Sequence, residues 1–310
     1  MNQPTTSAAP ATLAHSEEYF GDYRDFWWNA DFLELMARRW QLKQYRTLLD
    51  VGCGQCHWSR LLLPHLDSHP EITGLDRDPK WAAGDVKLCD EFAAKGATLN
   101  FRQGDAQQLP FANDSFDVVT CQTVLIHLAD PLAALREMHR VVRPGGMVIC
   151  SEPSNLANAG MAEAPDDLSS SAERVADYRY RLLCEIGKRL SGEGDSSLGD
   201  RLAYLFQQAG FEAVQSHLSD KAAPSLPPYL GLEQAANLDE LLDGMSAARC
   251  AVWDEHVRRW SAYLDAADAA FVAGYSAQRA ERYKRTRSLV DAGRYWSGGA
   301  TVMYLISARK

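Results

Sequence analysis

The sequence predicts an α/β fold with a doubly wound sheet of seven strands and helical insertions. Short apolar segments that fit strands alternate with amphipathic helical segments through the first half of the chain, as in parallel βαβ units. Glycines and carboxylates follow three successive strand segments, and in such a sheet these strand ends line one crevice. The chain has 310 residues, which is enough to bury a large core.

Seven segments have the length and apolar character of strands. They are residues 47–51, 71–76, 98–102, 116–121, 147–151, 211–216 and 301–307. Most of the segments between them have helical periodicity. Helices are expected at residues 17–40, 58–66, 81–95, 131–142, 172–190 and 200–209, and residues 221–294 are expected to be mostly helical. Pro144, Gly145 and Gly146 stop the fourth of these helices.

Composition limits the classes of partner. The net charge of −9 disfavours nucleic acid, whose phosphates favour clustered lysine and arginine. No apolar run approaches the roughly 20 residues of a membrane span, so no membrane partner is expected. Residues 1–10 lack the features of a secretion signal and are interpreted as a disordered tail. Seven cysteines without paired spacing favour a cytoplasmic protein, and the oligomeric state stays open.

The turn after the first strand is rich in glycine. It reads L-D-V-G-C-G, and Gly52 and Gly54 allow backbone to pass close to a ligand at the strand end. A dinucleotide-binding turn carries a further glycine five residues after the first, where this chain has His57. The turn therefore fits a ligand without a pyrophosphate. A tight turn with no ligand is the alternative interpretation.

Carboxylates follow the next two strands. Asp76 ends the second strand, where it can accept both hydroxyls of a ribose or serve only as a loop charge. Asp105 follows the third strand, in Gly104-Asp105-Ala106, where it can accept an adenine amino group or close an Asx turn. Because the three strand ends line one crevice, their combination indicates a ligand that contains adenosine.

The same turn contains a C-x-x-C pair, Cys53 and Cys56. A zinc site would need more ligands, and none follow at a suitable spacing. A redox pair would follow a thioredoxin-like strand and begin a helix. We therefore expect neither, and no metal site is predicted elsewhere in the chain.

Taken together, these motifs resemble those of class I S-adenosylmethionine-dependent methyltransferases. The resemblance rests on L-L-D-V-G-C-G, G-L-D, G-D-A-Q-Q-L-P-F, F-D-V-V and H-R-V-V-R-P-G-G, and covers about residues 45–155 and the last two strands. It implies a Rossmann-like fold with S-adenosylmethionine as cofactor. It also implies the cofactor contacts: Gly52, Cys53 and Gly54 at the methionine part, Asp76 at the ribose, Arg77, Asp105 and Ala106 at the adenine, and Cys121 and Gln122 beside the sulfonium and amine. In one departure, Cys56 stands where the family usually has a third glycine.

The resemblance also suggests how the chain is organised. Six segments are expected: a tail and lid helix at 1–40, a Rossmann-like cofactor-binding core at 41–155, a helical lid insertion at 156–199, a core helix and strand at 200–220, a helical insertion at 221–294, and the final core strand at 295–310. The two insertions are expected to cover the crevice.

Several side chains are candidates for catalysis. Tyr19, Tyr23, Trp27 and Trp28 could stabilise a sulfonium through cation–π attraction, or could simply form the packed stripe of their helix. His127 is a candidate general base or a structural histidine. Asn155 and either Tyr178 or Tyr180 are candidate acceptor contacts, with loop and packing roles as alternatives.

The leading hypothesis is in-line transfer of a methyl group to a small molecule of secondary metabolism, inside a lidded aromatic pocket. A second hypothesis is cyclisation of S-adenosylmethionine itself to azetidine-2-carboxylate, with release of methylthioadenosine. The motifs are compatible with a resemblance to methyltransferase-like azetidine-2-carboxylate synthases. A third hypothesis is a sensor that binds S-adenosylmethionine without catalysis.

Overall fold

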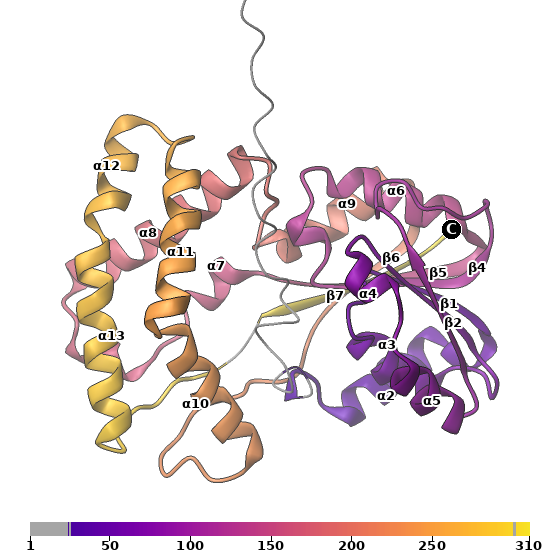
Figure 1. Ribbon diagram of the computed structural model, residues 1–310, viewed down its shortest axis with the longest axis horizontal. Coiled ribbons are helices and arrows are strands. Elements are labelled where there is room, and N and C mark those ends of the chain that lie inside the picture. Colours follow the sequence, from indigo (N-terminus) through magenta and orange to yellow (C-terminus); the bar gives the residue numbers. More distant parts are fainter. Residues whose placement is uncertain (1–23, 25, 300–301) are drawn as a thin grey trace, which may run out of the picture.

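The computed structural model describes residues 24, 26–299 and 302–310 (Figure 1). Its centre is a seven-stranded sheet in the order β3-β2-β1-β4-β5-β7-β6, which confirms the predicted Rossmann-like α/β fold. The strands are β1 Thr47–Val51, β2 Glu71–Asp76, β3 Thr98–Gln103, β4 Phe116–Gln122, β5 Val142–Pro153, β6 Glu212–Leu218 and β7 Met303–Arg309.

Strands β1 to β5 pair in parallel, whereas β7 lies antiparallel between β5 and β6. The sequence did not indicate this reversal. Its cause lies in the connection, because the chain leaves β6 at the carboxyl edge of the parallel strands and returns at that edge to begin β7. Met303, the first residue of β7, accordingly pairs with Pro153, the last residue of β5.

Helices cover both faces of the sheet. On one face the core contains Met36 and Trp40 from one helix and Phe92 from another. On the other face it contains Leu135 and Phe206. The helices of the first face are α2 Ala30–Trp40, α3 His57–Leu62 and α5 Val86–Ala94, and those of the second are α6 Pro131–Val141 and α9 Leu202–Gln208.

The remaining helices form a separate lobe beside the sheet (Figure 1). They are α8 Ser171–Leu190, α10 Leu232–Gly244, α11 Ala247–Ser261, α12 Ala266–Gly274 and α13 Ser276–Asp291. The lobe has its own core, in which Tyr180 of α8 stacks on Tyr275 at 4.4 Å and both pack with Trp260 of α11. Two insertions far apart in the sequence therefore build one lobe. The short helix α7 Asn155–Asn158 follows β5 directly and lies between lobe and sheet.

The first predicted helix is shorter than expected. Residues 17–23 lie outside the described residues, and the helix begins at Ala30, so that Trp27 and Trp28 precede it in a bend. The helix begins there because Asn29 has an extended backbone, with φ −82° and ψ 133°. Trp28 nevertheless packs in the core, against Phe32 and Trp58. Packing therefore explains why an apolar residue stands at this position, although the backbone there is not helical.

The helix predicted at 81–95 is two helices, α4 Pro79–Ala82 and α5. Gly84 separates them with φ +79°, a conformation that favours glycine. A Cβ at this glycine would lie 2.7 Å from the ring of Phe101, so the close approach also requires glycine. Asp85 then begins α5 by accepting hydrogen bonds from the first amide groups of the new helix.

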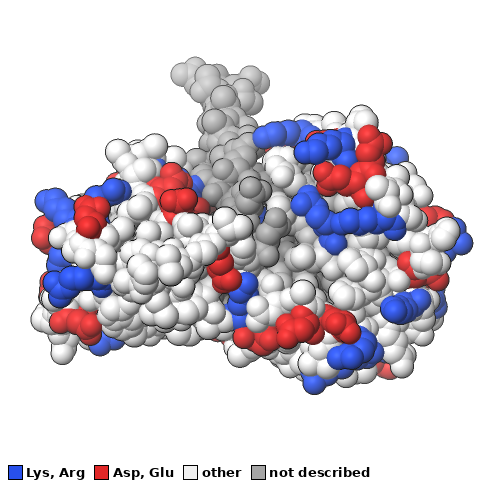
Figure 2. Space-filling model, turned by 90° about the horizontal axis from the view of Figure 1, so that it is seen from below, with Lys and Arg blue, Asp and Glu red and all other residues white. Residues whose placement is uncertain are grey.

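Within the described ranges, no helix is long and apolar enough to cross a membrane. On the face shown in Figure 2, basic and acidic side chains are interspersed, and neither kind forms a continuous patch.

The contact between α8 and α11 leads to a first prediction. A Cβ on Gly187 of α8 would lie 2.7 Å from the backbone oxygen of Trp260 in α11. We expect Gly187→Ala to lower the free energy of unfolding by about 1–3 kcal/mol through this overlap. The matched control is Gly244→Ala at the end of α10, where a Cβ would meet nothing within 4 Å. Urea denaturation should give the control a higher free energy of unfolding than Gly187→Ala, and equal free energies would contradict the prediction.

Candidate functional site

The carboxyl ends of the parallel strands lie in register along one edge of the sheet. Val51 of β1 pairs with Leu75 of β2, and Asp76 pairs with Gln103 of β3. On the other side of β1, Gln122 at the end of β4 pairs with Ser151 of β5. The turns that follow these strands, which carry the predicted site residues, therefore meet at the same edge.

The glycine-rich turn bends sharply over the end of β2. The amide groups of Gly52 and Cys53 both donate to the backbone oxygen of Leu75, at 2.7 and 3.0 Å. Gly52 has φ +67°, and a Cβ there would lie 2.5 Å from a methyl group of Val124. This position therefore has no room for a side chain, as expected of a turn that passes close to a ligand.

The C-x-x-C pair closes this turn. The amide of Cys56 donates to the backbone oxygen of Cys53 at 2.7 Å, and Cys56 has φ +58°, which explains why glycine suits this place. A hydrogen bond with Cys56 and burial raise the pKa of Cys53, which keeps its thiol protonated. Among the residues that the structure describes, no group of three His, Cys, Asp or Glu side chains could hold a metal ion.

Asp76 is buried and held in place by two backbone amide groups. One carboxylate oxygen accepts from Gly54 at 3.1 Å and the other from Asp78 at 2.9 Å. A carboxylate has about four lone-pair sites, so both oxygens can accept further bonds. Asp76 is thus fixed between the turns after β1 and β2, with capacity for two hydroxyl groups.

The turn after β3 is compatible with both interpretations of Asp105, as the residue that closes an Asx turn and as an acceptor for an adenine amino group. One oxygen of its carboxylate accepts from the amide of Gln107 at 2.8 Å, which forms the Asx turn. Its second oxygen is not needed for this turn. Gly104 ties the segment to β2 by donating to the backbone oxygen of Asp76 at 3.0 Å. Ala106 is buried beside it.

Sequence reasoning assigned no role to Glu152, which is fully buried at the end of β5. One oxygen of its carboxyl accepts from the amides of Val124 at 3.0 Å and Leu125 at 2.8 Å, and from the thiol of Cys121 at 3.8 Å. Its other oxygen has no hydrogen-bond partner among the described residues. Burial raises the pKa of Glu152 to about 7. This carboxyl fixes the segment after β4, which follows the predicted residue Gln122 and contains His127.

The comparisons with known proteins agree with this geometry. Residues 49–150 match a family model described as a methyltransferase domain. A demethylmenaquinone methyltransferase from Lysinibacillus sphaericus is 30% identical over 191 residues, which are 60% of this chain and 77% of that protein. One from Staphylococcus haemolyticus is 39% identical over 171 residues, 54% of this chain and 69% of that protein. The chain belongs to the class I S-adenosylmethionine-dependent methyltransferases.

A solved structure agrees on the fold of this methyltransferase. The crystal structure of the YcgJ protein from Bacillus subtilis has a TM-score of 0.52 at 19% identity, and the match covers 91% of this chain and 99% of that one. The protein is therefore an enzyme of this family, and its cofactor is S-adenosylmethionine. The residues present fit this cofactor, because Gly52 and Gly54 form a tight turn with positive φ at the strand edge and Asp76 has acceptor capacity for a ribose.

Most of the predicted cofactor residues of the methyltransferase come together at the strand edge. Arg77 differs from them because its side chain is exposed, while its backbone oxygen accepts from the side chain of Gln103 at 3.2 Å. The residues that follow or end β1 to β4 are Gly52, Cys53, Gly54, Asp76, Asp105, Ala106, Cys121 and Gln122.

The catalytic candidates are more scattered. His127 is exposed at the end of the short 3-10 turn Leu125–His127, and Asn155 is exposed at the start of α7. Tyr19 and Tyr23 lie outside the described residues. Tyr180 is buried in the lobe core, where its hydroxyl accepts from the side chain of Trp253 at 2.9 Å, so a packing role accounts for it.

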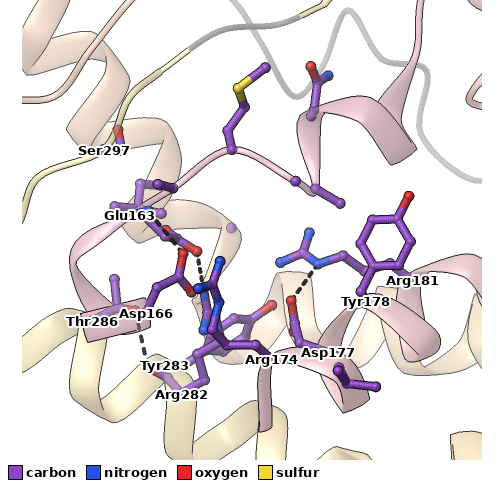
Figure 3. Close-up of a pocket in the computed structure, with 18 of the residues that line it drawn as sticks. Glu163, Asp166, Arg174, Asp177, Tyr178, Arg181, Arg282, Tyr283, Thr286 and Ser297 are labelled. Atoms are coloured by element: carbon purple, nitrogen blue, oxygen red, sulfur yellow. Dashed lines mark hydrogen bonds and ion pairs between the residues drawn. The ribbon is translucent and has the colours of Figure 1, made fainter. Parts of the chain in front are cut away.

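Tyr178 lines a cavity of about 950 Å³ that the sequence did not reveal (Figure 3). The walls come from α8, α10, α13 and the segment after α7. Four arginines in its walls were not singled out from the sequence: Arg174, Arg179, Arg181 and Arg282. Along α8, Arg174, Tyr178 and Arg181 recur at helical spacing on one face, a pattern that could have identified this wall.

The position of Asp76 leads to a prediction about cofactor affinity. We expect Asp76→Ala to weaken S-adenosylmethionine binding by about 1.5–3 kcal/mol, roughly 10- to 150-fold, because hydrogen bonds from the ribose to a charged acceptor are lost. Isothermal titration calorimetry measures this change. Asp90→Ala, on the exposed side of α5, is the matched control and should bind normally. Unchanged affinity in a folded Asp76→Ala protein would contradict the assignment.

The raised pKa of Glu152 leads to a prediction about how the stability of the fold depends on pH. Its pKa is ordinarily 4.5 and here about 7, so between these values the folded protein keeps a proton that the unfolded chain releases. Stability should therefore fall as pH rises through this window, by an amount on the order of 3 kcal/mol, and level off above it. Glu152→Gln stays neutral and keeps an acceptor oxygen, so it should remove this component. Urea denaturation of both proteins at pH 5 and pH 8 isolates the difference, and parallel pH profiles would overturn the prediction.

Proposed function

We propose that this enzyme transfers the methyl group of S-adenosylmethionine to a small-molecule acceptor held between the strand edge and the helical lobe. The observation that carries the proposal is the place of the 950 Å³ cavity. Its wall includes Asn158, the last residue of α7, which comes just after β5. The side chain of Asn158 accepts from the amide of Val302 next to β7, which ties the cavity wall to the strand edge.

The size and walls of the cavity suit a small acceptor. Ligand sites for small molecules have volumes of about 300–1,000 Å³ and combine apolar walls with a few polar groups. Here helices from both insertions line the space, and their side chains are apolar, aromatic and charged. A protein or nucleic-acid acceptor would instead need an open surface at the strand edge.

Cofactor contacts follow from the same proposal. The backbone of Gly52 and Gly54 would contact the methionine part, Asp76 would accept from the ribose, and Asp105 with Ala106 would bind the adenine. When bound, the cofactor supplies a methyl group that its sulfonium already activates. The protein then mainly orients the two reactants and excludes water from them. Exposed His127, on the segment that Glu152 fixes, is a candidate to take the acceptor's proton.

The relatives act on demethylmenaquinone according to their names. Their matches cover 60% and 54% of this chain, so two fifths or more of it lie outside each match. We therefore use these relatives only to propose methyl transfer as the reaction class. The chemical class of the acceptor is inferred from the residues that line the cavity.

Product identification tests the function directly. The purified enzyme is incubated with S-adenosylmethionine alone and with a panel of aromatic acids, phenols and amines, and nucleoside products are separated by chromatography. We expect S-adenosylhomocysteine only when an acceptor is present, and less of it with Asp76→Ala when the cofactor concentration is below saturation. Methylthioadenosine formed without an acceptor would instead establish cyclisation to azetidine-2-carboxylate. Tight cofactor binding with neither product would favour a sensor.

A further inference from the structure

We infer that the cavity of the helical lobe binds an acceptor with a flat apolar body and an anionic group such as a carboxylate, held by Arg181 and Arg174. This inference rests on the proposed function, because it identifies the cavity as the acceptor site. It follows from three features of the lining: the pairing of its carboxylates, the unused donors of its arginines and the apolar face of α8.

The carboxylates near α13 are already ion-paired. Arg282 of α13 forms ion pairs with both Glu163 and Asp166, the second at 3.0 Å (Figure 3). Glu163 also accepts from the hydroxyl of Tyr295 at 3.1 Å. These two acids therefore share one cation, and each already has an ion-pair partner within the wall.

The other lining carboxylates are paired in the same way. Glu240 of α10 pairs with Arg249 at 3.2 Å. Asp177 of α8 accepts from Nε of Arg181 at 3.0 Å and from the hydroxyl of Tyr275 at 2.8 Å. The cavity thus has no unpaired acid among its described lining residues, which disfavours an ammonium-bearing acceptor.

Two of the four lining arginines, Arg174 and Arg181, keep unused donors, whereas Arg179 is paired with Asp268 and Arg282 with two acids. Arg181 is bonded to Asp177 through Nε alone, and its two terminal nitrogens carry four further N–H groups. In Figure 3 its side chain extends over Asp177 toward the centre of the cavity. Arg174 lies one α-helical turn before Tyr178 on α8, and its guanidinium has no ion pair or hydrogen bond within the described part of the chain. Guanidinium groups bind carboxylates in a bidentate geometry, so these two residues suit an anion.

The same face of α8 also supplies an apolar surface for the body of the ligand. Val175, Tyr178 and Leu182 line the cavity and are 69%, 43% and 37% exposed. Their spacing of three and four residues places them on one side of the helix, next to Arg174 and Arg181. A ring that packs on this surface would place its anionic substituent at the guanidinium groups. Such an anchor at α8 would leave the opposite end of the acceptor free to face the strand edge.

A pair of matched dyes tests the chemistry of this site. 1-Anilinonaphthalene-8-sulfonate carries a sulfonate, and N-phenyl-1-naphthylamine has the same rings without it. With the enzyme saturated with S-adenosylmethionine, we expect the sulfonate dye to bind more tightly than the uncharged dye, as measured by fluorescence titration. Arg181→Gln and Arg174→Gln should each weaken the sulfonate dye about tenfold or more and leave the uncharged dye unchanged. Arg189→Gln, at the exposed end of α8 and outside the cavity, is the control and should have no effect.

The outcomes separate this inference from the proposed function. Equal binding of both dyes by the wild type, or no loss in either cavity variant, overturns the anionic site. If Arg181→Gln alters the fold, seen as a lower melting temperature, Arg174→Gln decides, because that guanidinium has no partner among the described residues whose loss could destabilise the lobe. Arginine-dependent dye binding without methyl transfer to any acid of the panel would leave the anion site standing and contradict only the methyl-transfer function. Methyl transfer to carboxylic acids and not to their methyl esters, with loss in both cavity variants, would support both.

Discussion

The site depends on one geometric constraint, the common register of five parallel strands at their carboxyl ends. The register sets Gly52 beside Asp76, Asp76 beside the turn after β3, and Gln122 beside the end of β5. Hydrogen bonds between the turns then fix their side chains. The bond from Gly54 to Asp76 couples the first two turns, and Glu152 couples the last two by accepting from the segment after β4. A polar cofactor can be bound by short side chains because the backbone has already brought them together.

The reversed strand β7 explains where the helical lobe stands. The chain leaves β6 and re-enters β7 at the carboxyl edge, so the residues inserted between them are built at the cofactor site and not at the opposite edge. The insertion after β5 begins at the same edge with α7. Both insertions then share one core through Tyr180, Trp260 and Tyr275. The topology of the sheet therefore determines that a lobe made of distant segments is built at the carboxyl edge of the parallel strands.

The strands and the site on the sheet could be predicted because their determinants are local. An apolar run ending in glycine indicates a buried strand and a tight turn, and the positive φ of Gly52 and Cys56 bears out the tightness of that turn. Local patterns fail where distant contacts decide. The helical pattern of 81–95 is broken at Gly84 because Phe101 packs against it, and Trp27 and Trp28 have helical spacing without a helix. The roles of Glu152 and Arg282 depend on distant partners, which lie 27 to 31 residues away for Glu152 and 119 residues away for the bond from Arg282 to Glu163. No spacing in the sequence reveals such contacts.

Helix α8 contacts both the cavity of the helical lobe and the segment after β4. Its Arg181 and Tyr178 line the cavity, and two turns further on Lys188 is buried and donates to the backbone oxygen of Ile126 at 3.4 Å, in the segment that Glu152 also holds. The contact is close, because a Cβ on Gly194, just after α8, would lie within 3 Å of that same backbone. Burial lowers the pKa of Lys188, and Glu185 opposes this shift, so the ammonium group keeps its place through nearby carboxylates. Under the proposed function, this helix would fix the distance between an acceptor held in the cavity and the segment after β4, and an in-line transfer needs that distance to be set.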